Sequence, residues 1–245
     1  MRILLAENDP LHRAFLRSAV EGLVAGAPEI VEAEDGRAAI EAACAAPPDL
    51  AVLDVEMPEA SGVDAARAIW RANAGARILF WSNYADEAYL RALSKIVPAD
   101  AAYGYVLKSA SATRLRVALR GVFLEDRCII DREVRGVQQR AEDRLEGLTD
   151  SEYEILVDLA LGLTDKAIAA RLGISVRGAQ IHLQHLYEKL RVVADGEGGG
   201  EWGPTYNSRT RAVYLALSRG LLNPGNLGRE DRRLAAWLAA HRGAT

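Results

Sequence analysis

The sequence predicts an α/β domain with a doubly wound, five-stranded parallel sheet, followed by an all-α domain. Three observations lead to this fold class. Short apolar runs alternate with helical patterns over about the first 124 residues, which is typical of repeated β–α units. No strand pattern appears from Leu148 onward, where helical segments follow one another. A chain of 245 residues that is 50% hydrophobic is long enough for two modest cores.

The five expected strands are short apolar runs, and the stretches between them repeat apolar residues at helical spacing. Patterns such as GRAAIEAACAA and SGVDAARAIWRAN are of this helical kind. They supply the crossover connections that neighbouring parallel strands need. The runs themselves are RILLA, EIVEA, DLAVL, RILFW and AYGYVL.

The chain is expected to divide into four segments. Residues 1–124 form the α/β domain, and the charged residues 125–147 form a linker. Residues 148–222 form the all-α domain, which contains a Gly-rich insert at 194–208. Residues 223–245 form a tail helix.

The insert and the tail have no obvious role in either predicted domain. We expect the insert, with Trp202 and Tyr206, to be either a disordered loop or a segment whose aromatic side chains dock on the α/β domain. The tail helix is amphipathic, and its apolar face is expected to pack on its own chain or on a second copy. That face carries Leu234, Trp237, Leu238 and His241.

Composition excludes several classes of protein. The two cysteines, Cys44 and Cys128, are too few for a disulfide framework and are expected to be reduced thiols. The four histidines form no cluster with the spacing of zinc ligands. No apolar run reaches the roughly 18 residues of a membrane span, and the sequence begins without a signal-peptide pattern. We therefore expect a cytoplasmic protein.

Polar side chains follow several of the predicted strands at the point where each strand ends. Glu7 and Asn8 follow the first strand, Asp54 the third, Ser82 the fourth and Lys108 the fifth. In an open parallel sheet, ligands bind beyond the carboxyl ends of the strands. The sequence therefore predicts a polar site at this edge of the sheet.

Phosphoryl transfer to a carboxylate is the chemistry that such a set supports. Asp54 is a competent nucleophile for an activated phosphoryl group. Lys108 can pair with the product and Ser82 can donate a hydrogen bond to it. A Mg²⁺ ion prefers oxygen ligands and neutralises phosphoryl oxygens. Its expected ligands are Glu7, Asn8, Asp54 and the backbone carbonyl of Glu56.

The motifs ILLAENDPL, DLAVLDVEMPEASGVD, ILFWSN and GYVLK, in this order, resemble the receiver domain of two-component response regulators over about residues 1–124. The resemblance implies that a sensor histidine kinase phosphorylates Asp54. It also gives Ser82 and Lys108 the role of contacting the phosphoryl group. Tyr105 matches the aromatic position whose ring moves inward when the hydroxyl is drawn toward that group.

Two departures from the family leave alternatives open. Asn8 stands where receivers usually carry a second acidic residue, so we expect weakened Mg²⁺ binding. The stretch LSKIVPADAAYGY is about five residues longer than the family's usual connection between the fourth helix and the fifth strand. One alternative is a pseudo-receiver, a regulator or scaffold that works without phosphorylation. Another is a phosphatase similar to haloacid dehalogenases, with Asp54 as nucleophile, although Glu56 stands where that family has a second Asp.

The segment LTDSEYEILVDLALGLTDKAIAARLGISVRGAQIHLQHLYEKL resembles the LuxR-type helix-turn-helix of the NarL/FixJ family over about residues 148–222. The second helix of such a motif enters the major groove of DNA. It is expected over Val176–Leu190, with Ser175 as its N-cap. Its core-facing positions are Ala179, Leu183, Leu186 and Leu190.

The outward positions of this helix are the candidates for DNA contact. Glutamine can pair with the edge of adenine and arginine with guanine, while an aliphatic side chain can contact the methyl group of thymine. Two further residues suit phosphate contacts, Lys166 and His182. The candidates for base reading are Arg177, Gln180, Ile181, Gln184 and His185.

The charge of the all-α domain bears on how this domain would bind DNA. Between Glu146 and Leu221 there are eight basic and ten acidic residues, whereas a DNA-binding domain usually presents a basic face. We therefore expect a homodimer that binds two half-sites of double-stranded promoter DNA. The alternative is a helical module for protein contacts. The resulting prediction is a transcription regulator without catalytic residues, gated by phosphorylation of Asp54.

Overall fold

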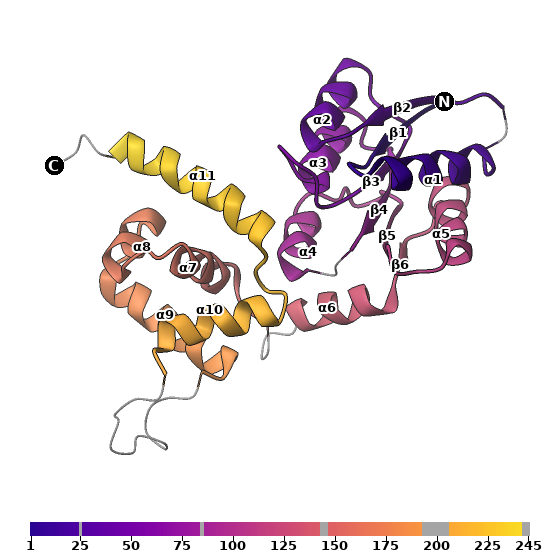
Figure 1. Ribbon diagram of the computed structural model, residues 1–245. Helices are drawn as coiled ribbons and strands as arrows, with labels where there is room; N and C mark the ends of the chain where they lie inside the picture. Colours follow the sequence, from indigo (N-terminus) through magenta and orange to yellow (C-terminus); the bar gives the residue numbers. More distant parts are fainter. Residues whose placement is uncertain (25, 84–85, 143–146, 193–205, 242–245) are drawn as a thin grey trace. The chain divides into compact units, whose positions relative to one another are not determined.

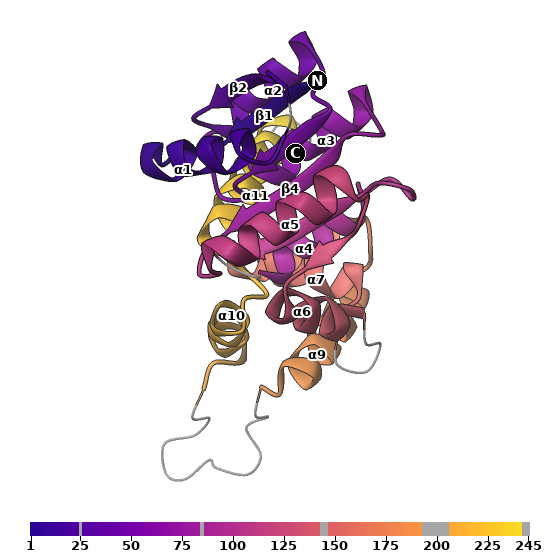
Figure 2. The same cartoon turned by 90° about the vertical axis from the view of Figure 1, so that its right-hand side faces the viewer.

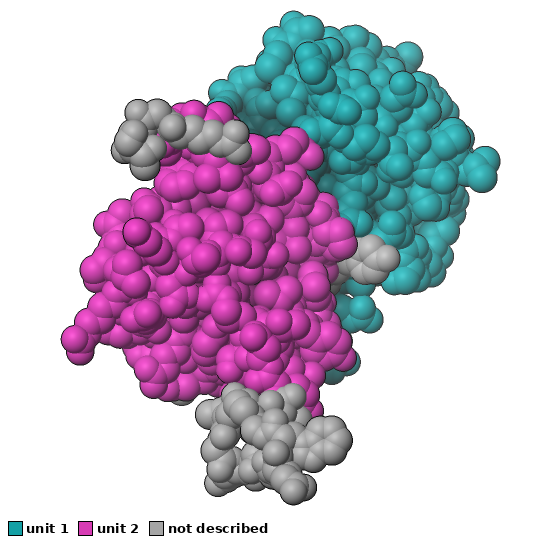
Figure 3. Space-filling model, turned by 60° about the vertical axis from the view of Figure 1, so that its left-hand side comes forward, with its two compact units in different colours: residues 1–85, 89–137 teal, residues 86–88, 138–245 magenta. Residues whose placement is uncertain are grey.

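The computed structural model contains two compact units, which Figure 3 colours separately: residues 1–85 with 89–137, and residues 86–88 with 138–245. We call them the N-terminal and the C-terminal unit and describe each by itself. Most of the Gly-rich insert, including Trp202, lies outside the described residues. The structure describes residues 1–24, 26–83, 86–142, 147–192 and 206–241.

The N-terminal unit is built on a parallel sheet with the strand order β2-β1-β3-β4-β5-β6. The doubly wound α/β prediction is confirmed, but the predicted number of five strands is wrong. A sixth strand pairs with β5 through Gly104–Ile129 and Tyr105–Ile130. Two residues are too few to give a recognisable apolar pattern, and they lie in a charged stretch. The strands are β1 (Arg2–Ala6), β2 (Glu29–Ala33), β3 (Leu50–Leu53), β4 (Arg77–Ser82), β5 (Tyr103–Leu107) and β6 (Ile129–Ile130).

Helices cover both faces of this sheet (Figure 1). On one face lie α1 (Pro10–Glu21) and α5 (Ala112–Leu124), and α5 lies in front of the strands in Figure 2. On the other lie α2 (Gly36–Ala45), α3 (Gly62–Ala72) and α4 (Glu87–Ser94). Successive side chains of a strand point to opposite faces, so the buried strands are apolar throughout. In β1, for example, Ile3 and Leu5 join the core beneath α1 and α5, while Leu4 and Ala6 join the other core.

The stretch 125–147, predicted as a linker, contains β6 and α6 (Arg132–Glu142). Asp131 fixes this edge of the sheet because its carboxylate accepts from the Leu107 N–H and from Arg114 Nε, both at 2.9 Å. Val134, in the first turn of α6, is buried in the core of the N-terminal unit. The sheet therefore extends into residues 125–147, whose charged composition indicates a linker.

All regular structure in the described residues of the C-terminal unit beyond α6 is helical. Thr149, Thr164 and Ser175 cap the first three helices by accepting from backbone N–H groups. Among the residues that the structure describes, no helix combines the length and apolar character needed to cross a membrane. The helices are α7 (Asp150–Ala160), α8 (Asp165–Leu172), α9 (Val176–Leu190), α10 (Ser208–Ser218) and α11 (Pro224–His241).

Helix α11 begins before the amphipathic pattern seen in the sequence. Asn223 accepts from the Asn226 N–H at 2.7 Å, and Asn226 donates to the hydroxyl of Tyr153 in α7 at 3.0 Å. Leu234 is the buried member of the apolar face predicted for the tail, whereas Leu238 is exposed. The helix is therefore held to its own unit by its first turn and by Leu234.

A buried carboxylate links three helices of this unit. Asp158 of α7 is 2% exposed and pairs with Arg171 of α8. Arg171 in turn lies 3.6 Å from the Glu230 carboxylate of α11. Burial raises the pKa of Asp158 to about 6; the Arg171 charge opposes this rise, and the Glu154 and Glu230 charges add to it.

This raised pKa predicts a pH dependence of stability. Between its ordinary value of 3.8 and about 6, the folded unit holds more protons on Asp158 than the unfolded chain does. The free energy of unfolding therefore falls as pH rises through this interval, by no more than about 3 kcal/mol. Asp158→Asn is expected to remove this slope. Hydrogen exchange of α7 peptides, compared between wild type and variant at each pH, measures this slope. If the free energy of unfolding changed with pH in the same way in both proteins, the assignment to Asp158 would be contradicted.

Candidate functional site

The predicted polar site lies at the carboxyl ends of β1, β3 and β5. The ammonium of Lys108 is 2.7 Å from Glu7 Oε2 and 2.9 Å from Asp54 Oδ2. All three side chains are at least nine-tenths buried. Parallel strands that end at one edge of the sheet thus bring together residues that are far apart in the sequence.

The pKa values of Asp54 and Lys108 are both shifted at this site. Burial raises the pKa of Asp54 above its ordinary value, although the hydrogen bond and charge of Lys108 oppose this. Burial by itself lowers the pKa of Lys108, but the hydrogen bonds and charges of Glu7 and Asp54 outweigh it and raise that pKa. Lys108 is therefore a permanent cation, shared by two carboxylates. With both carboxylates ionised, the site carries one excess negative charge.

Local backbone geometry fixes the two carboxylates. Glu7 Oε1 accepts from the Asp9 N–H at 3.1 Å, and Asp54 Oδ1 accepts from the Glu56 N–H at 3.1 Å. Asp9 is the N-cap of α1, where its carboxylate accepts from the Leu11 and His12 N–H groups. Because that bonding occupies the Asp9 carboxylate, Glu7 is the acidic residue after β1 that reaches Lys108.

The donor set fits a hard divalent cation. Two buried carboxylates, Glu7 and Asp54, share one ammonium, and Glu56, whose carbonyl is the other predicted ligand, lies two residues after Asp54 in the chain. Asn8 is exposed at the rim. Within the described ranges, no group of three His, Cys, Asp or Glu residues forms a ready-made metal cluster. A cation here would therefore need carbonyl, amide or water oxygens besides the two carboxylates.

Ser82 and Tyr105 are both buried. Ser82 is the last residue of β4, and its carbonyl accepts from the Lys108 N–H at 2.7 Å. Tyr105 lies in β5 and stacks on Phe80, with 6.0 Å between the ring centroids. Its ring therefore already lies inside the core, packed against the neighbouring strand.

Two residues that were not among the predicted site residues lie beside this site: Trp81, which the sequence shows only as a bulky neighbour of Ser82, and His12. The ring of Trp81 lies 5.3 Å from the Lys108 ammonium and 5.2 Å from the ring of His12. His12 Nδ1 is 3.8 Å from Glu7 Oε1. The strand alternation that places Ser82 also sends Trp81 to the opposite face of the sheet, where α1 begins. That signal could have identified the pair.

The second candidate site is the outer surface of α9. Its bounds and its Ser175 cap are as predicted, and Gly173, with φ of 66°, makes the left-handed turn that separates it from α8. The four predicted core positions are buried. The predicted base-reading residues are all exposed, Lys166 is exposed in the first turn of α8, and His182 is half-buried. The exposed residues on α9 are Arg177, Gln180, Ile181, Gln184 and His185.

Family models match both halves of the chain. Residues 3–120 match the response regulator receiver domain, and residues 146–196 match the luxR family of bacterial regulatory proteins. The nitrate/nitrite response regulator protein NarP of Escherichia coli is 32% identical over 200 residues, which cover 78% of this chain and 89% of NarP. The transcriptional regulatory protein YdfI of Bacillus subtilis is 30% identical over 203 residues, which cover 80% of this chain and 86% of YdfI.

Solved structures share the fold at lower identity. RcsB from Salmonella enterica serovar Typhimurium, bound to promoter P1flhDC in the presence of phosphomimetic BeF3⁻, superimposes with a TM-score of 0.58 at 20% identity. That match covers 89% of this chain and 98% of RcsB. A second RcsB–DNA complex gives a TM-score of 0.54 at 22% identity and covers 77% of this chain and 91% of RcsB.

Proposed function

Because this chain belongs to the NarL/FixJ family of two-component response regulators, we propose that phosphorylation of Asp54 by a sensor histidine kinase controls its binding to promoter DNA. The chain has a receiver domain and a LuxR-type DNA-binding domain. The observation that carries the proposal is the buried Lys108 ammonium held between Glu7 and Asp54 at the edge of the sheet. Such a protein acts in the cytoplasm, where its promoter DNA lies.

The proposed reaction is transfer of a phosphoryl group from a phosphohistidine of the kinase. An oxygen of Asp54 attacks phosphorus, the P–N bond breaks, and the imidazole leaves with the electron pair and takes up a proton. Lys108 pairs with the acyl phosphate that forms, and the Ser82 hydroxyl donates to one of its oxygens. A bound Mg²⁺ ion would neutralise phosphoryl oxygens during the transfer. It would be held by Glu7, Asn8, Asp54 and the carbonyl of Glu56.

The proposed output is a change in dimerisation. The new phosphoryl charge draws the Ser82 hydroxyl toward Asp54, beside which the Lys108 ammonium already lies, and the packing around Tyr105 adjusts to that movement. A dimer brings two copies of α9 to two half-sites of double-stranded DNA. Arg177, Gln180 and the other exposed α9 residues then read bases, while Lys166 and His182 contact phosphates.

The phosphorylation step is tested by intact mass after incubation with Mg²⁺ and acetyl phosphate. Wild type is expected to gain one phosphoryl group, and Asp54→Ala is expected to lose that adduct completely. Asn8→Asp adds a carboxylate at the rim and is expected to raise the adduct fraction at limiting Mg²⁺.

Each other outcome has a distinct meaning. An adduct that persists in Asp54→Ala contradicts the assignment of the phosphoacceptor. An adduct on Asn8→Asp alone would mean that Asn8 silences the site, which is the pseudo-receiver alternative. Continuous release of inorganic phosphate from many donor molecules per chain would instead indicate a phosphatase.

A further inference from the structure

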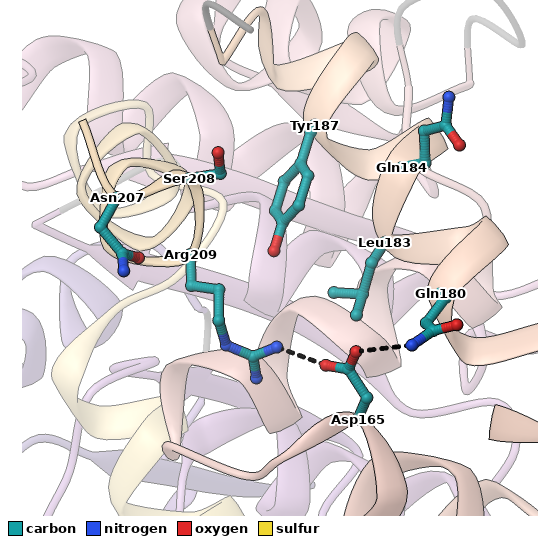
Figure 4. Close-up of a pocket in the computed structure, with 8 residues that line it drawn as sticks. All are labelled: Asp165, Gln180, Leu183, Gln184, Tyr187, Asn207, Ser208 and Arg209. Carbon is teal, nitrogen blue, oxygen red and sulfur yellow. Dashed lines mark hydrogen bonds and ion pairs between the residues drawn. The ribbon is translucent and has the colours of Figure 1, made fainter. Parts of the chain in front are cut away.

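An open pocket of about 420 Å³ lies in the C-terminal unit beside the predicted base-reading face of α9 (Figure 4). The start of α8, one side of α9 and the start of α10 form its walls. Gln180 and Gln184 of α9 line it, together with Asp165 of α8 and Arg209 of α10. Because the Gln180 side chain borders an open pocket and is exposed, hydrogen bonding rather than packing sets the orientation of its amide.

Asp165 is the residue that binds this amide. Gln180 Nε2 donates to Asp165 Oδ2 at 3.4 Å. The other carboxylate oxygen, Oδ1, accepts from Arg209 Nη1 at 2.5 Å, and Arg209 also donates to the carbonyl of Leu163. Figure 4 shows both bonds meeting at the one carboxylate. Arg209 therefore holds the carboxylate in place and balances its charge, so that Asp165 does not present an unpaired negative charge to DNA.

The chemistry of the carboxylate determines which end of the amide faces it. An ionised carboxylate only accepts hydrogen bonds, so the amide must turn Nε2 toward Asp165. One hydrogen of Nε2 is then used, and Oε1 lies beside the remaining hydrogen. An acceptor beside a donor matches adenine, whose major-groove edge offers the N6 donor beside the N7 acceptor. Guanine offers two acceptors, O6 and N7, which this fixed amide cannot satisfy together.

We propose that Asp165 is a positioning residue for base recognition: it fixes the amide of Gln180 so that this side chain reads adenine rather than guanine. The inference rests on the proposed DNA-binding function of α9. It assigns a role in specificity to Asp165, which is not among the residues predicted to read bases. Without Asp165 the amide can rotate and present its NH₂ group to either purine.

The test is selection of bound sequences from a random-sequence DNA duplex library by the full-length protein. Gln180→Ala identifies the operator position that Gln180 reads, since preference is lost there. Asp165→Asn is expected to reduce the adenine-over-guanine preference at that same position from about tenfold to about twofold, and to leave the other positions unchanged. Asp231→Asn is the matched control, because it makes the same substitution at an exposed position of α11.

A second variant, Asp165→Ser, keeps a residue suited to the start of a helix but is too short to reach Gln180. The two Asp165 variants and wild type are compared by circular dichroism and thermal melting. The proposal is overturned if a folded Asp165 variant keeps the full adenine preference, if preference falls equally at all positions, or if Gln180→Ala alters no position. Failure of the proposed function looks different, because wild type then enriches no sequence at all.

Discussion

Replacing Lys108 with methionine is expected to destabilise the N-terminal unit by about 3–5 kcal/mol near neutral pH. The substitution removes the cation that lies within 3 Å of both Glu7 and Asp54 and leaves two buried carboxylates beside each other. Two adjacent carboxylates in a buried site cannot both stay ionised without cost. The pKa of Asp54, which burial already raises in the wild type, therefore rises further in the variant, because Lys108 no longer opposes that rise.

The sign of the pH effect follows from this raised pKa. In the variant, the folded state binds protons that the unfolded chain releases, so its free energy of unfolding increases as pH falls. Mg²⁺ is expected to stabilise the variant more than wild type, because the ammonium no longer competes for the two carboxylates. Protons, the lysine ammonium and Mg²⁺ thus compete for the same two carboxylates, those of Glu7 and Asp54.

Hydrogen exchange of the β1 and β3 peptides in urea measures the stability of this unit within the whole chain. Lys95→Met is the matched control, since Lys95 is exposed on the loop after α4. Equal exchange rates in the two variants would contradict the role assigned to Lys108. Stabilisation by Mg²⁺ that is no greater in Lys108→Met than in wild type would contradict competition at the carboxylates.

The location of this site could be predicted from the sequence because of a general property of parallel sheets. Apolar runs of four to six residues mark the strands, and the polar residue after each run lies at a common edge. Glu7, Asp54 and Lys108 meet there as expected. Which acidic residue after β1 reaches the lysine depends on the capping of α1 by Asp9, and that is a matter of local geometry.

Features that depend on the approach of distant segments were not predicted. Strand β6 consists of two residues, and what makes it a strand is the neighbouring edge of β5. The Gln180 amide is bound by Asp165, and Asp165 is held in turn by Arg209, which is 44 positions later in the chain. Asp158 is buried in the structure, whereas a charged side chain in a helix is usually expected to be exposed. Periodicity reports the face of an element but not the polar partner across it.

Gly62→Ala is expected to destabilise the N-terminal unit by roughly 3 kcal/mol or more. A Cβ at this position would lie 2.1 Å from the carbonyl oxygen of Asp54 and 2.9 Å from its carbonyl carbon. These are backbone atoms, so no side-chain rotation relieves the overlap. The Gly62 N–H also donates to the Val55 carbonyl at 3.0 Å, which holds the start of α3 against the end of β3. To accept the methyl group, the backbone that carries Asp54 must move.

This displacement predicts two coupled losses. The variant should unfold at lower urea concentration, and its folded fraction should form less phosphoryl adduct with Mg²⁺ and acetyl phosphate, because Asp54 no longer faces Lys108 correctly. Gly75→Ala is the matched control in the same unit, since the nearest atom to its Cβ is Asn73 Oδ1 at an ordinary 3.5 Å. If Gly62→Ala lost stability but formed adduct at the wild-type rate, the position of the Asp54 backbone would not limit the reaction. Loss of both in Gly62→Ala alone would show that packing beneath Asp54 is part of the site.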